Sequence, residues 1–130
     1  MLHHVMIGSS DIERAKSFYN AVLGVLGARA PIEHHNDTGQ LRLFYIHDGS
    51  TFCISEPIDG EPATAANGST IGFACNSPAQ VKEFHDVAVA NGGISVEDPP
   101  GPRESKLGTM HLCYFLDPDG HKICGIHRPG

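Results

Sequence analysis

Apolar and polar positions follow the same order in two parts of the chain. In the first part, the short apolar run at residues 2–7 predicts a strand, and a Gly-Ser-Ser break ends it. Ser10 is expected to cap the helix that follows, with Glu13 completing a capping box and Gly24 providing a stop. Residues at helical spacing predict the buried face of this helix: Ile12, Ala15, Phe18, Tyr19 and Val22.

The second part repeats the first at a nearly constant distance along the chain. Four pairs of positions match: His4 with Thr70 and Phe18 with Phe84 at an offset of 66, then Tyr45 with Tyr114 at 69 and Cys53 with Cys124 at 71. The last step reflects a turn that is two residues longer in the second copy. The chain is therefore predicted to contain two copies of one module.

The second module begins with equally clear helix signals. Residues 70–75 predict a strand, and Ser77 is expected to cap the following helix. Pro78 takes the first helical position and Gln80 completes a capping box. The pair of glycines after Asn91 ends the helix.

The remainder of each module predicts strands and turns. In the first module we expect a short strand near Ala28, a polar loop at residues 33–39, and strands at 41–47 and 51–56 around an Asp-Gly turn. In the second we expect strands at residues 94–97, 110–116 and 121–127, with a tight turn at 117–120. The Pro-rich segment 98–108 is expected to be a loop, because proline lacks the amide donor and fixes φ. Residues 57–69 predict a linker between the modules.

Composition narrows the classes of function. A chain of 130 residues with 40% hydrophobic residues predicts one compact domain. The net charge of −6 and the scattered basic residues argue against nucleic acid as a partner. No apolar run approaches the roughly 20 residues that cross a membrane, and no secretory signal opens the chain, so we expect a cytoplasmic protein. The four cysteines form no CxxC pair and are expected to be buried free thiols.

Three segments make the sequence resemble the vicinal-oxygen-chelate superfamily of glyoxalases, bleomycin-resistance proteins and dioxygenases. They are HHVMIGSSDIERAKSFY, TIGFACNSPAQVKEFH and FLDPDGHKICGIH. The resemblance implies an α+β fold in which two tandem βαβββ modules form a curled mixed sheet around a cavity. It implies a single domain over residues 1–130, with modules at 1–56 and 70–128. It also implies a homodimer that acts on a small molecule.

The resemblance further implies a divalent metal ion held by the first and last strands of each module. The matching positions are His4 and Cys53 in the first module and Thr70 and Cys124 in the second. The family uses His or Gln and Glu at such positions, so this chain keeps only the histidine. One imidazole and two thiols would favour zinc, with Thr70 placed to hold a water or substrate. A lyase of the glyoxalase I type also moves a proton through a metal-bound Glu, which these positions lack.

Two functional hypotheses therefore stand side by side. The chain is either a metal-dependent enzyme with altered ligands, or a metal-free small-molecule binding protein of the bleomycin-resistance kind, in which His4 and the thiols are packing residues. His111 is a candidate acid or base. Arg103 and Lys106, in the Pro-rich segment, are candidates to bind an anionic substrate under a lid. The aspartates at positions 117 and 119 are expected to form a turn rather than a catalytic pair.

Overall fold

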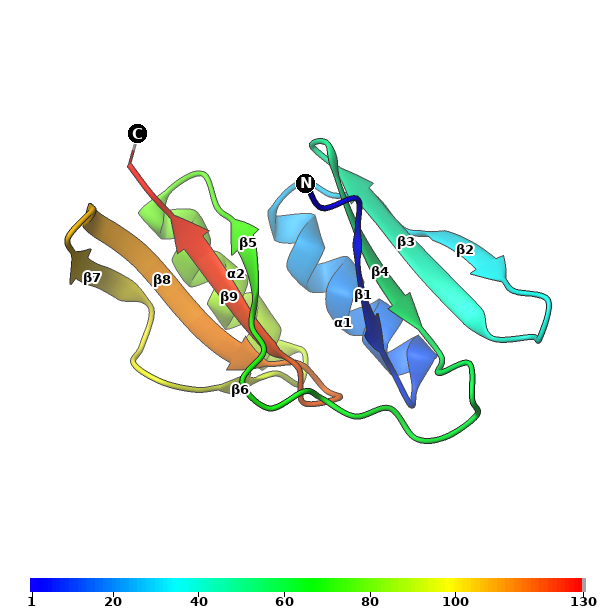
Figure 1. Cartoon of the computed structure of the whole chain (residues 1–130). Helices are drawn as coiled ribbons and strands as arrows, with labels where there is room; N and C mark the ends of the chain where they lie inside the picture. The colour runs from blue at the N-terminus through cyan, green and yellow to red at the C-terminus, as the bar shows by residue number, and fades with distance from the viewer. Residues whose placement is uncertain (130) are drawn as a thin grey trace.

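The computed structural model describes residues 1–129, which contain two helices and nine strands (Figure 1). The first module consists of β1 (Val5–Gly8), α1 (Ile12–Val25), β2 (Ile32–His35), β3 (Leu41–His47) and β4 (Ser50–Ser55). The second consists of β5 (Ile71–Ala74), α2 (Pro78–Ala90), β6 (Ile94–Ser95), β7 (Gly101–Ser105), β8 (Gly108–Leu116) and β9 (Lys122–His127). Neither of these helices is long and apolar enough to span a membrane.

Each module forms its own sheet, and the predicted α+β fold is confirmed. The first sheet has the order β1-β4-β3-β2, and the second has the order β5-β9-β8-β6, with β7 also paired to β8. In each module the first strand runs parallel to the last, and the other pairs are antiparallel. Figure 1 shows the two sheets side by side, with β1 and β5 at the facing edges and both helices on one side. The sheets do not close into a barrel.

The helices and sheets share one hydrophobic core that joins the modules. Phe18, Tyr19 and Val22 of α1 are essentially inaccessible to solvent, as is Phe84 of α2. The helices contact each other directly. Phe52 in β4 meets Phe73 in β5 edge to face, with ring centroids 5.2 Å apart. This aromatic packing crosses the boundary between the modules, so both modules contribute to one hydrophobic core.

The helix starts differ in how well the sequence predicted them. Ser77 caps α2 as expected, accepting from the Gln80 amide at 3.0 Å. In α1 the prediction of Ser10 was wrong, because Asp11 is the N-cap and accepts from the Arg14 amide at 3.1 Å. The hydroxyl of Ser10 instead accepts from the amide of Ala63 in the linker, at 2.8 Å.

Two strands replace segments that were expected to be loops. β2 occupies residues 32–35, where Ile32 faces Phe44 in the neighbouring strand, and no strand forms near Ala28. β7 begins inside the Pro-rich segment, where Pro102 faces His111 of β8. Since β7 pairs only with β8 within residues 1–129, it is an edge strand, where proline is tolerated. Residues 57–69 contain no helix or strand, as predicted for the linker.

Candidate functional site

The turn between β8 and β9 (residues 117–121) forms hydrogen bonds to the start of the first module, and we call this contact the clasp. Tyr19 in α1 donates to Oδ2 of Asp117 at 2.5 Å, and the amides of Asp119 and His121 both donate to Oδ1 at 2.9 Å. The carboxylate of Asp119 accepts from the Ser9 hydroxyl at 2.7 Å. These bonds close one end of the boundary between the modules.

Burial shifts the pKa values of the two central groups of this clasp. Loss of hydration raises the pKa of the Asp117 carboxyl, although the bond from Tyr19 and the two amides oppose the shift. Burial also raises the pKa of Tyr19 well above its ordinary value, and the neighbouring Asp117 carboxylate adds to that shift. The tyrosine of the clasp therefore stays protonated at neutral pH. Both aspartates lie in the turn that the sequence predicted.

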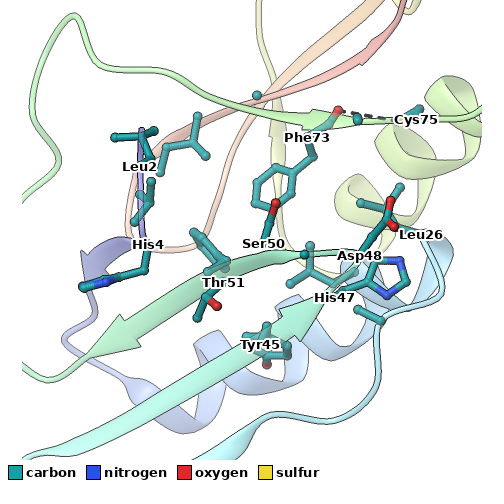
Figure 2. Close-up of a pocket in the computed structure, with 18 of the residues that line it drawn as sticks. Leu2, His4, Leu26, Tyr45, His47, Asp48, Ser50, Thr51, Phe73 and Cys75 are labelled. Carbon is teal, nitrogen blue, oxygen red and sulfur yellow. Dashed lines mark hydrogen bonds between the residues drawn. The ribbon is translucent and has the colours of Figure 1, made fainter.

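The opposite end of the module boundary is open. There the shorter turn between β3 and β4, which contains Asp48 and leads into Ser50 of β4, faces the end of β5 across a cavity of about 580 Å³. Figure 2 shows Phe73 reaching from β5 toward β4, with Leu2 and His4 on one side of it. The cavity thus occupies the place that mirrors the clasp.

The cavity combines an apolar interior with a polar rim. Its apolar surface comes from both sheets and from the end of α1: Leu23, Leu26, Phe52, Ile71 and Phe73. Its polar side chains include three histidines and one carboxylate: His3, His4, His47 and Asp48. Among residues 1–129, no lysine or arginine lines it. Such a surface suits a compact molecule with an apolar body and few polar groups.

The four cysteines are buried free thiols, as predicted. Burial raises the pKa of each: to about 11 for Cys75, to about 12 for Cys113, and upward for Cys53 and Cys124. A backbone hydrogen bond from residue 126 partly offsets the shift of Cys75. All four are therefore protonated at neutral pH and are poor nucleophiles in this state.

Comparison with known proteins identifies the family. A family model described as the Glyoxalase/Bleomycin resistance protein/Dioxygenase superfamily matches residues 1–124. The chain belongs to this superfamily. None of the curated proteins matches the chain.

Solved structures of superfamily members and related proteins agree with this assignment. A glyoxalase/bleomycin resistance protein from Albidiferax ferrireducens is 48% identical, with a TM-score of 0.89, over 98% of this chain and 99% of that one. A glyoxalase-related enzyme from Fulvimarina pelagi is 20% identical, with a TM-score of 0.72, over 99% and 89%. A mutant of the fosfomycin resistance protein FosX from Listeria monocytogenes, complexed with Mn(II) and a dihydroxypropylphosphonic acid, is 18% identical, with a TM-score of 0.69, over 99% and 93%. The last two similarities show the fold alone.

The metal ligands that the superfamily resemblance implied are not brought together within this chain. His4 is exposed just before β1, and its Nδ1 atom lies 2.9 Å from Nδ1 of its neighbour His3. Cys53 and Cys124 are buried in β4 and β9.

Within residues 1–129, no group of three or more His, Cys, Asp or Glu side chains is placed to hold a metal ion. Every buried side-chain nitrogen or oxygen there already has a hydrogen-bond partner. These donors do not fit a resident metal in a single subunit.

The other predicted residues of the superfamily site are also spread over the molecule. Thr70 is exposed just before β5, and Lys106 is exposed at the turn between β7 and β8. Arg103 lies in β7 rather than in a loop and donates to main-chain carbonyls of the preceding Pro-rich segment. His111 pairs with His127 across β8 and β9, on the side of the sheet that also carries buried Cys113.

His111 and Cys124 therefore point to different sides of the second sheet. Cys113 packs toward Phe84 of α2, since both would contact a side chain at residue 125. Cys124, one position along β9, faces away from that helix by strand alternation. Of the residues predicted for the site, His4 is the one that lines the cavity.

Sequence reasoning missed most residues of the cavity. Ser50, Phe73, Ala74 and Gln80 carry no motif that predicts ligand binding. The one available signal was the two-residue difference between the turns at Asp48 and Asp117. That difference becomes informative only when both turns are seen to approach the module boundary.

Proposed function

We propose that the chain binds a small molecule in the cavity between its two modules and needs no metal ion of its own to do so. The observation that carries this proposal is the cavity of about 580 Å³, large enough for a ligand of modest size. Its aromatic interior supplies apolar contact, and its histidine and carboxylate rim supplies polar contacts. The scattered positions of the metal-ligand candidates favour a binding protein of the bleomycin-resistance kind over a metalloenzyme.

A fragment screen by ligand-observed NMR tests the proposal. The Ser50→Trp variant fills the cavity from its rim, and Ser17→Trp adds the same bulk on the exposed face of α1. We expect fragments that bind the native protein and the Ser17→Trp variant but not the Ser50→Trp variant. If every fragment that binds does so equally to both variants, the cavity is not the binding site.

A metal-dependent enzyme is the second candidate, because strand alternation places two of the predicted ligands on the same face of the first sheet. Cys53 lies opposite Met6 in the β1–β4 ladder, and His4, two residues before Met6, shares that face. Cys124 lies opposite Gly72 in the β5–β9 ladder. A second copy of the chain is the arrangement that would complete such a site, with zinc as the ion that suits thiol ligands.

Elemental analysis separates the two candidates. The protein, purified without a histidine tag, is analysed for Zn, Ni, Mn and Fe, both as isolated and after exposure to each ion. The binding-protein proposal expects well under one equivalent of metal, unchanged by His4→Ala or Cys124→Ser. Near-stoichiometric metal that falls in both variants would support an enzyme, including one of the glyoxalase I type, which lactoylglutathione formation then tests.

The homodimer and the cytoplasmic location remain predictions. Light scattering after size-exclusion chromatography measures the mass of the particle, and about twice the 13.9 kDa of one chain is the expected result. Partners other than a small molecule and a second copy, such as nucleic acid or a membrane, are not expected from the charge of −6 and its scattered distribution.

A further inference from the structure

The two ends of the module boundary are built from matching backbone positions. Gly8 at the end of β1 lies opposite Ser55, and the amide of Ser9 donates to the carbonyl of Ser55 at 3.0 Å. In a parallel ladder, alternate residues of a strand form the bonds to a given neighbour, and Ser9 is one of the residues that bond to β4. The carbonyl of Gly8 therefore points away from β4, toward the second module.

At the end of the boundary that the clasp closes, a side chain of the second module lies against the carbonyl of Gly8. Nε2 of His121, which follows the turn of the clasp, lies 2.7 Å from the carbonyl oxygen of Gly8. The carbonyl can only accept, so the imidazole donates. A flat ring with an N–H group thus occupies the edge of β1.

At the open end, the matching carbonyl belongs to Ala74, which is 66 positions after Gly8 (74 − 8). Ala74 lies opposite Ile126 in β9, and the amide of Cys75 donates to the carbonyl of Ile126 at 2.7 Å. By the same rule, the carbonyl of Ala74 points away from β9. Ala74 lines the cavity, and within residues 1–129 β5 pairs with β9 alone.

The counterpart of His121 at the open end is too short to fill the space. At the offset of 71 that relates the last strands of the modules, the matching residue is Ser50 (121 − 71). Ser50 also lines the cavity. A hydroxymethyl group replaces an imidazole there, so the volume taken by a ring at one end is open at the other.

The polar groups around this volume favour a ligand that donates a hydrogen bond over an anionic ligand. Asp48 is the acidic residue of the lining, and no lysine or arginine accompanies it among residues 1–129, although three histidines line other parts of the cavity. The start of α2 offers few free amides, because Pro78 has none and the amide of Gln80 donates to Ser77. The amide of Asn76 donates to the side chain of Gln80 at 2.7 Å. An anion at this end of the cavity would therefore find no lysine or arginine and few free main-chain amides, whereas a donor finds a carbonyl and a carboxylate.

We infer that the cavity selects an uncharged or cationic ligand with a flat apolar body and an N–H or O–H group, which donates to the carbonyl of Ala74 as His121 donates to that of Gly8. This inference rests on the proposed function and specifies the ligand class for the same site. The apolar body lies against Phe52 and Phe73, whose rings line the cavity. Selectivity comes from the main chain, because a ligand that displaces water from the carbonyl of Ala74 without donating to it leaves that carbonyl unpaired.

Calorimetric titration with indole, 1-methylindole and indole-3-carboxylate tests the inference on the full chain. These ligands share a ring and differ in the donor or the charge. We expect indole to bind, 1-methylindole to bind about 3- to 10-fold more weakly because it lacks the N–H group, and the carboxylate to bind more weakly than indole. Methylation adds apolar area, so a site without donor selectivity would bind 1-methylindole at least as tightly.

A pair of variants locates the effect. Ser50→His places an imidazole at the counterpart of His121 and is expected to weaken indole binding at least about fivefold by occupying the same volume. Ser17→His adds the same group on the exposed face of α1 and leaves binding unchanged. Equal affinity for indole and 1-methylindole, both sensitive to Ser50→His, would overturn the donor inference while the proposed function stands. Absence of indole binding would also overturn it, and the fragment screen then decides the proposed function separately.

Discussion

The hydroxyl of Tyr19 and the carboxylate of Asp117 form a 2.5 Å hydrogen bond inside the protein, and this bond joins the two modules. Tyr19 belongs to α1 of the first module, and Asp117 belongs to the turn before β9 of the second. Both residues are buried, with exposed fractions of 0% and 3%. Because a buried carboxylate is costly without donors, this contact stabilises the packing of the second module against the first.

We expect Tyr19→Phe to lower the free energy of unfolding by about 1–3 kcal/mol, because it leaves Oδ2 of Asp117 without the tyrosine donor. Urea unfolding measures the change. Tyr45→Phe is the matched control, since Tyr45 is also buried but donates to the neutral amide oxygen of Asn20 at 2.8 Å. Its loss is expected to be smaller, about 0.5–1.5 kcal/mol. Equal losses of stability in both variants would show that the bond to Asp117 contributes no more than the bond to the neutral Asn20.

The buried thiols predict a loss of stability in alkaline solution. An unperturbed cysteine has a pKa of 9.0, and burial raises the pKa to about 11 for Cys75 and to about 12 for Cys113. Above pH 9 the unfolded chain therefore releases thiol protons that the folded protein retains, so unfolding becomes more favourable as pH rises. Below pH 9 both states hold the protons and this effect vanishes.

The size of this pH effect is measurable by urea unfolding under reducing conditions. Between about pH 9 and pH 10, each such thiol is expected to lower the free energy of unfolding by about 1 kcal/mol. Cys113→Ala, compared with the native protein, should reduce this slope even though it also lowers stability at every pH. A slope that the substitution leaves unchanged would mean that Cys113 ionises equally in both states.

The glycine at position 125 is expected to be required by packing. A Cβ atom there would lie 2.8 Å from the sulfur of Cys113 and 2.8 Å from Cδ2 of Phe84. We expect Gly125→Ala to destabilise the protein by about 1–3 kcal/mol, because two buried side chains must move. Gly72→Ala in neighbouring β5 is the control, since a Cβ there meets nothing within 4 Å. Thermal unfolding should leave that control within about 0.5 kcal/mol of the native protein, and a similar loss in both would contradict the packing explanation.

The sequence predicted the elements whose signals are local or repeated. The offset of 66 between His4 and Thr70 predicted two modules, and both modules are present. Ser77, followed by Pro78 and Gln80, predicted the start of α2 correctly, because that cap uses only adjacent residues. In α1 the cap moved to Asp11, because the amide of Ser10 is bound instead by Asp119, 109 residues away.

The missed elements depend on partners that are distant in the sequence. β2 is exposed and weakly apolar, and it exists because it pairs with β3 along residues 41–44. β7 contains a proline and forms because β8 supplies a partner across residues 108–112. The cavity depends on how two turns of different length meet the opposite module. No local pattern around Ser50 or Ala74 carries that information.

Arg103 is expected to hold the Pro-rich segment in place rather than to bind substrate. Its guanidinium donates to the carbonyls of Asp98 and Pro99 at 3.1 and 2.9 Å, and to those of Gly101 and Pro102 at 3.2 and 3.3 Å. We expect Arg103→Ala to accelerate cleavage after Glu97 by a Glu-specific protease at least about threefold, because local opening of this segment becomes easier. Mass spectrometry identifies the cleaved bond. Lys106→Ala removes an exposed charge at the next turn and should leave the rate unchanged. Ligand binding that falls in Arg103→Ala without any change in cleavage would instead support a direct contact with substrate.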